Sequence, residues 1–273
     1  MDEIWVPSQF NMETFSRSGV ELSKLRKVSY GVDTSFFHPI PASRREGPFR
    51  FLYTFAFGWR KGFDLLLRAY AEEFHPEEGV ELLLKVLPWR NLSVSRILAE
   101  IRSCLPQGRR IASVRLQIGQ ASMDDLRRMY AECDLYISTD RANGWGMPCM
   151  EAMAMGRPAA TIDWSGSTEF MNSQNSLLIH PSGRLVPVDS RLVAESPHYR
   201  GHQWAEVQVE EVRRVLRLAF KDRSLLSRIA SQAAAEIKEY YCLESAGRAV
   251  AAALPKSGWG CADGKPSVEL LSG

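Results

Sequence analysis

Apolar runs and helix-period patterns alternate through the middle of this chain. Short apolar runs predict buried strands at residues 49–57, 80–87, 114–119, 135–138 and 157–163. The stretches between them, 61–74, 92–105, 122–134 and the residues from about Pro148, place apolar side chains at the spacing of one helix face. Strands that alternate with helices form right-handed βαβ units and a parallel sheet covered on both faces. We therefore predict an α/β fold with a Rossmann-like, doubly wound parallel sheet.

The residues before this alternation are organised differently. Residues 3–8 predict a short strand, and the residues that follow predict a helix to about Gly19. Residues 25–33 predict a second strand, which ends in a turn at Gly31. Residues 39–48 are rich in Pro and Arg and are typical of a linker.

The pattern becomes helical after the last predicted strand. Helical stretches begin at Trp204 and are predicted over 204–222, 223–241 and 243–254. The last residues are rich in Gly, Ser and Lys, and we predict a disordered tail over 255–273. The apolar stripes at 80–87 and 214–220 are predicted to be core, as are the side chains of Trp164 and Trp204.

Composition narrows the class of protein. The 273 residues are 45% hydrophobic and 24% charged, which is ordinary for a globular protein. A net charge of +2 argues against a dedicated nucleic-acid-binding protein. The chain shows no apolar run of about 18 residues and no signal-peptide pattern at "MDEIWVPSQF". We therefore expect a cytoplasmic protein.

The cysteines indicate neither a disulfide framework nor a zinc site. They are odd in number and scattered, with no CxxC pair, at Cys104, Cys133, Cys149, Cys242 and Cys261. No Asp-x-Asp motif follows a predicted strand, so we expect no metal site. Asp124 and Asp125 are better explained as charges in the first turn of a helix with Ser122 as its N-cap.

Candidate chemistry lies at the carboxyl ends of the predicted strands, where open parallel sheets bind ligands. The first motif there is "GWRKG", in which Lys61 stands between a strand end and a helix start, beside Arg60 and Gly62. A cation is unfavourable at a helix N-terminus unless an anion completes the site, and phosphate is the natural anion. The alternative is that Lys61 and Arg60 are solvated loop charges.

A second motif of the same kind is "NGWGMPCME". Gly144 and Gly146 would allow a ligand close to the backbone, and Pro148 suits the first helical position. Free backbone N–H groups that could face a diphosphate belong to Trp145, Gly146 and Met147. Glu151, one turn into the helix, could accept hydrogen bonds from the vicinal hydroxyls of a sugar. The alternative is that Glu151 only favours the helix dipole.

Several segments in register resemble a known family. They are "WVPSQF", "KVSYGVDTSFF", "RKGFDLLLRAYAEEF", "MDDLRRMYAECDLYIS" and "NGWGMPCMEAMAMGRPAATIDWSGSTEFM". Together they resemble the C-terminal half of a retaining, nucleotide-sugar-dependent glycosyltransferase of the GT-B fold, family 4 (glycosyl transferases group 1). The segment that begins "HQWAEV" is similar to a Trp-Ala-Glu segment of one subgroup. The resemblance covers roughly residues 3–253.

The resemblance implies roles for individual residues. The family's E-x7-E signature falls on positions 143 and 151, so Glu151 would hold the ribose of the nucleotide. Asn143 stands where the family has the Glu that contacts the donor sugar, which puts sugar preference or turnover in question. Lys61 matches the phosphate-binding Lys, and Arg60 is our candidate for the family's missing partner Arg.

The remaining donor-binding residues follow from the same comparison. The base would rest near the loop of the third motif, "IGQAS", at Ile118, Gly119 and Gln120. The catalytic set expected from the resemblance is Lys61, Asn143 and Glu151. The donor-binding set is Arg60, Gly62, Ile118, Gly119, Gln120, Gly144, Trp145, Gly146 and Met147.

The implied activity is transfer of a sugar from a nucleotide diphosphate sugar, without a cofactor or metal, to a glycan, lipid or protein acceptor. The implied division is an inter-domain strand and linker at 1–45, a nucleotide-sugar-binding domain at 46–254 and the tail. The resemblance also implies an N-terminal GT-B domain outside this chain as a partner, and none of the five histidines matches that domain's catalytic His.

Two other functions stay open at this point. One is a catalytically inactive nucleotide-sugar-binding or interaction domain left by truncation, which the missing half and Asn143 favour. The other is a nicotinamide-dependent oxidoreductase, against which the absence of a GxGxxG fingerprint argues.

Overall fold

The computed structural model describes residues 2–40, 47–89 and 92–254 of the chain. The tail predicted at 255–273, together with Cys261, lies outside the described residues, as does part of the linker predicted at 39–48.

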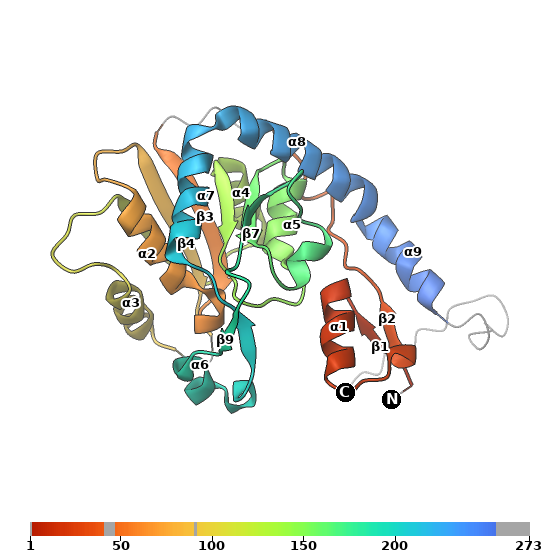
Figure 1. Ribbon diagram of the computed structural model, residues 1–273. Coiled ribbons are helices and arrows are strands. Elements are labelled where there is room, and N and C mark those ends of the chain that lie inside the picture. Colours follow the sequence, from red (N-terminus) through yellow and green to blue (C-terminus); the bar gives the residue numbers. More distant parts are fainter. Residues whose placement is uncertain (1, 41–46, 90–91, 255–273) are drawn as a thin grey trace, which may run out of the picture.

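A parallel sheet forms the centre of the molecule (Figure 1). In the described part of the chain it has six strands, in the order β5-β4-β3-β6-β7-β8. Their bounds are β3 Phe49–Ala56, β4 Val80–Leu87, β5 Ser113–Ile118, β6 Leu135–Ser138, β7 Ala159–Ile162 and β8 Leu177–Ile179. The chain winds outward from β3 to β5 and then returns to β6 on the other side of β3. This order confirms the predicted doubly wound α/β fold and places a topological switch point between β3 and β6.

The central strands form because their sequences are apolar almost without interruption. β3 and β4 pair over their whole length, from Phe49 opposite Val80 to Ala56 opposite Leu87. Nearly every residue of both strands is buried, as expected for strands covered on both faces. β8 was not predicted from the sequence, because a three-residue strand shows too few positions for a pattern.

Helices cover both faces of the sheet. The bounds of the helices in this part of the chain are α2 Phe63–Glu73, α3 Val94–Ser103, α4 Met123–Glu132, α5 Met147–Ala154, α7 Val209–Lys221, α8 Arg223–Tyr240 and α9 Leu243–Ala253. Of these, α9 extends away from the sheet (Figure 1) and has no buried residue. α2 packs against α7, and α5 packs against α8 (Figure 1). α4 begins with a capping box in which Ser122 and Asp125 bond to each other's backbone N–H groups, so Asp125 is a first-turn residue as predicted.

A small lobe lies beside α9, apart from the main sheet (Figure 1). It contains β1 Ile4–Val6, α1 Gln9–Arg17, the 3-10 turn η1 Leu22–Lys24 and β2 Leu25–Lys27. β1 and β2 are parallel and pair only with each other in the described residues. The strand predicted at 25–33 is therefore too long: it ends at Lys27, and farther on only Val32 forms an isolated bridge, to Cys242.

The prediction of a helix from Trp204 is wrong. The chain first makes an excursion with β9 Leu185–Pro187, α6 Ser190–Glu195, the 3-10 turn η4 Pro197–Tyr199 and β10 Gln203–Ala205. Trp204 lies in β10, opposite Val186 of β9. It is buried, as expected, and the Arg141 guanidinium stacks on its ring. The amphipathic pattern that suggested a helix belongs to α7, which begins at Val209.

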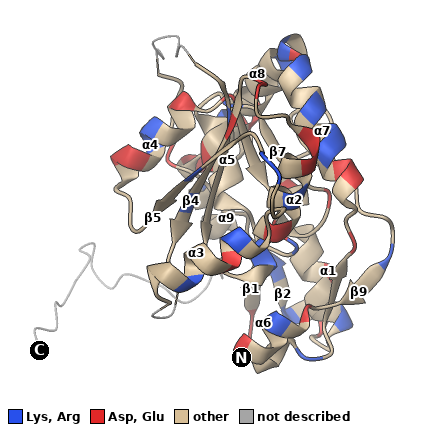
Figure 2. Cartoon of the chain, turned by 90° about the vertical axis from the view of Figure 1, so that its left-hand side faces the viewer, with Lys and Arg blue, Asp and Glu red and all other residues tan. Residues whose placement is uncertain are grey.

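Charged side chains of both signs are interspersed over the helices, for example along α4 and α7 (Figure 2). No helix within the described ranges is long and apolar enough to cross a membrane. The cysteines that the structure describes are all free thiols.

Candidate functional site

The loop after β3 carries Lys61. It contains the 3-10 turn η2 (Trp59–Lys61), so Lys61 lies before α2 and Gly62 joins the two. Gly62 has a positive φ of 61°, and a Cβ there would lie 2.0 Å from the carbonyl oxygen of Thr139. Thr139 follows β6, so a glycine at this position lets the loops after β3 and β6 touch.

An ion pair joins the same two loops. The Lys61 Nζ lies 2.7 Å from Oδ2 of Asp140, whose side chain is 6% exposed against 20% for Lys61. The Tyr53 hydroxyl lies beside the other carboxylate oxygen of Asp140 and 2.6 Å from the Lys61 carbonyl oxygen. Burial and the neighbouring Asp140 raise the pKa of Tyr53, which keeps its hydroxyl proton.

Neither Asp140 nor Tyr53 was selected from the sequence. A signal for Asp140 existed, because it is a carboxylate two residues beyond the end of β6, at the edge of the sheet where ligands bind. Tyr53 lies inside the apolar run of β3, where nothing distinguishes it from a core aromatic residue.

Arginines add further ties between these loops. Arg141 donates to both carboxylate oxygens of Asp64, at 2.7 and 2.9 Å, and to the Trp59 carbonyl at 2.8 Å. The Arg60 guanidinium donates to the Ala142 carbonyl. The loops after β3 and β6 therefore behave as one bonded unit.

The glycine-rich motif leads into α5. Gly146 has a φ of 100°, a conformation that favours glycine, and it precedes the first residue of the helix, Met147. Pro148 is accordingly the second helical residue, one later than predicted. Within the described ranges, the backbone N–H groups of Trp145, Gly146 and Met147 donate to no protein acceptor. The Trp145 ring is buried against the rings of Phe170 and Tyr241, so a ligand could contact this residue only through its backbone.

Asn143 is engaged within the protein. Its Oδ1 accepts a hydrogen bond of 3.1 Å from the Ser167 N–H, and its own N–H donates to Ser165 Oγ at 3.2 Å. Ser167 belongs to the 3-10 turn η3 (Gly166–Glu169) after β7. Asn143 therefore ties the glycine-rich motif to the next loop, which its sequence context did not indicate.

Glu151 lies on the side of α5 that faces α4. Its Oε2 accepts a hydrogen bond of 2.6 Å from the Tyr130 hydroxyl. Burial raises the pKa of Glu151, and the bond from Tyr130 acts in the opposite direction. A desolvated carboxylate with a donor already in place is suited to accept further hydroxyl donors.

The charges of the Lys61 loop reach the first turn of α5. Burial raises the pKa of the Cys149 thiol, Asp140 raises it further and Lys61 lowers it. The Lys61 loop is also bonded to the segment that leads into α5, since the Arg141 N–H donates to the Arg60 carbonyl at 2.9 Å and the Arg60 guanidinium donates to the Ala142 carbonyl. Cys149 is two residues before Glu151 on α5. The structure therefore brings the Lys61 loop and the start of α5 together, while Glu151 is turned toward Tyr130.

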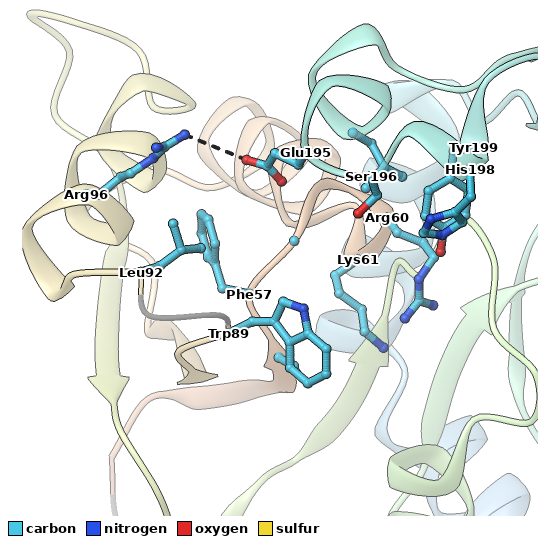
Figure 3. A pocket seen from close by; sticks show the side chains of 13 residues that line it. Phe57, Arg60, Lys61, Trp89, Leu92, Arg96, Glu195, Ser196, His198 and Tyr199 are labelled. Carbon is cyan, nitrogen blue, oxygen red and sulfur yellow. Dashed lines mark ion pairs between the residues drawn. The ribbon is translucent and has the colours of Figure 1, made fainter.

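A cavity of about 500 Å³ opens beside Lys61. Figure 3 shows Lys61 and Arg60 on one side and an ion pair of 3.7 Å between Arg96 of α3 and Glu195 of α6 across from them. Trp89, which follows β4 and is 54% exposed, also lines it. The cavity combines cations with aromatic surface, but neither Asn143 nor Glu151 is among its lining residues.

The loop after β5 is held by a buried lysine. The Lys85 ammonium donates to the carbonyls of Gly119 and Gln120, at 2.9 and 3.0 Å, and burial lowers the pKa of Lys85. Ile118 and Gly119 are half-buried and Gln120 is exposed. The carbonyls that a base could have used are therefore already bonded, and contacts to this loop would rely on its other atoms.

Histidines and acidic groups offer little additional chemistry. All five histidines are exposed, and His198 lines the cavity. In the described part of the chain, no group of three or more His, Cys, Asp or Glu side chains is arranged to hold a metal ion.

The model of one protein family matches residues 48–190, just over half of the chain, and its description is glycosyl transferases group 1. The chain belongs to this family. The matched residues contain the whole of the Lys61 loop, the Asp140 loop and α5. No curated protein matches the sequence of this glycosyltransferase domain significantly.

Solved structures share its GT-B Rossmann-like fold. Anabaena Alr3699/HepE, in complex with UDP and glucose, is similar with a TM-score of 0.71 and 17% identity, over 92% of this chain and 62% of that one. Sucrose-phosphate synthase from Thermosynechococcus elongatus has a TM-score of 0.66 and 18% identity, over 92% and 57% of the two chains. The C-terminal domain of LpcC, a Francisella tularensis glycosyl transferase group 1 family protein, has a TM-score of 0.57 and 16% identity, over 78% of this chain and 100% of that one.

The glycosyltransferase domain is thus shorter than the first two of these proteins, since it spans about three fifths of their length. Alr3699/HepE is also known in complex with UDP-glucose.

Proposed function

We propose that this domain binds a nucleotide diphosphate sugar and is the C-terminal, donor-binding half of a retaining, metal-independent family 4 glycosyltransferase. The observation that carries the proposal is the junction of the loops after β3 and β6. Lys61 is paired there with Asp140, and its loop is bonded to the segment that leads into α5, next to a cavity lined by Lys61 and Arg60. Bound UDP in a similar structure supports the same class of ligand.

The diphosphate would lie at this junction. Lys61 and Arg60 supply positive charge, and the N–H groups of Trp145, Gly146 and Met147 supply donors at the positive end of α5. During transfer the leaving diphosphate gains negative charge, and fixed donors of this kind stabilise it without a metal ion. In a retaining transfer that phosphate would also assist the incoming acceptor hydroxyl.

The sugars would contact α5 and the glycine-rich motif. Glu151 would accept hydrogen bonds from the ribose hydroxyls, with Tyr130 holding the carboxylate. Asn143 would donate to the transferred sugar through its Nδ2, because its Oδ1 is taken by Ser167. The base would rest near residues 118–120, against side-chain and ring surface, since Lys85 binds the carbonyls of this loop.

The rest of the enzyme would be a second domain, with residues 1–45 as the inter-domain segment and 46–254 as the donor-binding domain. The enzyme would be cytoplasmic. Its acceptor would be a glycan, a lipid or a protein. The similar structures are longer than this chain, which supports a two-domain enzyme.

A second candidate is a module that binds the nucleotide sugar without turnover. Asn143 favours it, because an amide replaces a carboxylate and its oxygen is used inside the protein. Hydrolysis of the donor by the purified chain, alone and with a supplied N-terminal domain, separates the two candidates. Turnover supports the enzyme, and binding without turnover in both mixtures supports the module.

Thermal unfolding in the presence of UDP, GDP and ADP tests the shared claim. Ligand at about one hundred times its Kd stabilises the folded state by about 2.7 kcal/mol, which raises Tm by several degrees. We expect one of the three nucleotides to raise Tm and Lys61→Met to reduce that rise. No rise with any of them at millimolar concentration would exclude the proposed site.

A further inference from the structure

Asp140 is a charged residue at the junction to which the proposed function gives no role. It is acidic, buried and in contact with the cation expected to bind the diphosphate. We propose that Asp140 is an internal counter-ion that competes with the ligand for Lys61 and speeds release of the nucleoside diphosphate product. This inference rests on the proposed function of the same site.

The geometry makes the competition direct. One carboxylate oxygen of Asp140 is 2.7 Å from the Lys61 ammonium, and the Tyr53 hydroxyl lies beside the other. Tyr53 is itself fully buried, so the carboxylate is held from both sides and has little freedom to move away. A phosphate oxygen that reaches Lys61 is therefore brought close to a second, fixed negative charge, and like charges at such distances repel strongly.

Other contacts also hold the two loops together. Gly62 contacts Thr139 directly, Arg141 binds Asp64 through two hydrogen bonds, and Arg60 binds Ala142. A buried ion pair also contributes little net stability, because desolvation of both charges offsets their attraction. The pair therefore fits a role in setting the charge that the cavity presents better than a role in folding.

The net charge of a ligand determines how strongly the Asp140 carboxylate weakens its binding. A nucleoside diphosphate has a free terminal phosphate and carries more negative charge than the corresponding nucleotide sugar. A fixed carboxylate near Lys61 therefore disfavours the product more than the donor. The nucleoside diphosphate would leave faster, although the domain would bind its ligands less tightly in the ground state. Faster release is useful where product release limits turnover.

Asp140→Asn tests the inference, since it removes the charge and keeps the shape and a partner for Tyr53. We expect UDP to bind about tenfold more tightly to this variant at low ionic strength, and UDP-glucose to gain less. The gain should shrink as salt rises, because the added attraction is electrostatic. Uridine, which has no phosphate, should bind equally to both proteins. Asp140→Ser, measured in parallel, supplies a second uncharged side chain.

Asp163→Asn is the matched control. Asp163 directly follows β7 at the same edge of the sheet and is paired with His180, 3.3 Å away, with no contact to Lys61. Its loss should change the affinity for UDP by less than about twofold, as is usual for an exposed charge pair.

The outcomes separate this inference from the proposed function. Unchanged or weaker UDP binding in both Asp140 variants, with Lys61→Met still weakening it, overturns the counter-ion and leaves the site intact. A gain that is equal for UDP and uridine would also overturn it, because a structural change and not charge would then be the cause. Failure of the wild type to bind UDP, GDP or ADP overturns both proposals.

Discussion

Gly62 is the residue at the junction that least tolerates a side chain. Its φ is positive, and an added Cβ would meet the Thr139 carbonyl oxygen at 2.0 Å. We predict that Gly62→Ala lowers the free energy of unfolding by about 3 kcal/mol or more, because strain and a backbone clash add. Denaturant unfolding measures the loss.

Gly58 in the same loop is the control. Its φ of 167° is ordinary extended backbone, and no atom lies within 4 Å of an added Cβ. Gly58→Ala should therefore change stability by less than about 1 kcal/mol. Equal losses of stability in Gly62→Ala and Gly58→Ala would show that Gly62 does not lie so close to the Thr139 carbonyl.

Glu151 should make stability depend on pH in an unusual direction. Burial raises its pKa above the ordinary 4.5, so the folded protein holds this proton at pH values where the unfolded chain has lost it. The stabilisation is complete below the unfolded pKa and is lost as pH rises through the folded pKa. Relative to Glu151→Gln, the wild type should therefore lose stability as the pH rises above 4.5.

Thermal unfolding of both proteins across this range provides the measurement. Glu21→Gln, a change at an exposed carboxyl, should leave the pH dependence of the wild type as it is. A wild type that instead gains stability over Glu151→Gln as pH rises would contradict the burial of this carboxyl.

Single residues show which parts of the site a sequence can reveal. Lys61 and Glu151 stand in local motifs, so the sequence makes them candidates, and the family resemblance supplies their expected roles. Asp140, the ion-pair partner of Lys61, lies far away in sequence, 79 residues from Lys61 and 87 from Tyr53. Only the folded sheet brings β3 beside β6, and no local pattern encodes that pairing.

Arg141 makes one of the connections between α2 and the loop after β6. Arg141 binds Asp64 with two hydrogen bonds, and both side chains are about one fifth exposed. We predict that Arg141→Lys lowers the free energy of unfolding by about 1–2 kcal/mol, because an ammonium does not reproduce the planar fork of the guanidinium. Urea unfolding at fixed salt measures it.

Arg214→Lys is the comparison variant. Arg214 pairs with Glu211 one turn away on α7 and is half exposed, so its loss should cost less than about 0.5 kcal/mol. If Arg141→Lys and Arg214→Lys lower the free energy of unfolding by the same amount, the Arg141–Asp64 ion pair contributes no more than an exposed pair.

The long elements were predicted from the sequence, whereas several of the short ones were not. β3 and β4 are continuous apolar runs of eight residues, and the sequence shows them plainly. β8, β9 and β10 have three residues each, and their pairing partners decide their structure. Trp204 is an example, because its strand forms by pairing with Val186 of β9, and the residues next to Trp204 in the sequence do not predict it.

At the scale of the whole molecule, the site lies at the point where strand order reverses. β3 and β6 are adjacent in the sheet but far apart in the chain, so their loops meet at one edge. This arrangement explains why a doubly wound fold could be predicted from alternating patterns, and why the candidate site was expected at this edge of the sheet. The details of the cavity depend on the excursion between β9 and β10, which the sequence pattern did not reveal.

The central claim is that the Lys61 loop and α5 bind one nucleoside diphosphate together. Isothermal titration calorimetry of UDP into the wild type, Lys61→Ala and Glu151→Ala tests it most directly, with GDP or ADP in place of UDP if that nucleotide gives the larger rise in Tm. Each substitution should weaken binding by about 1–3 kcal/mol, the scale of a lost charge-assisted hydrogen bond. Wild-type affinity in both variants would contradict the account.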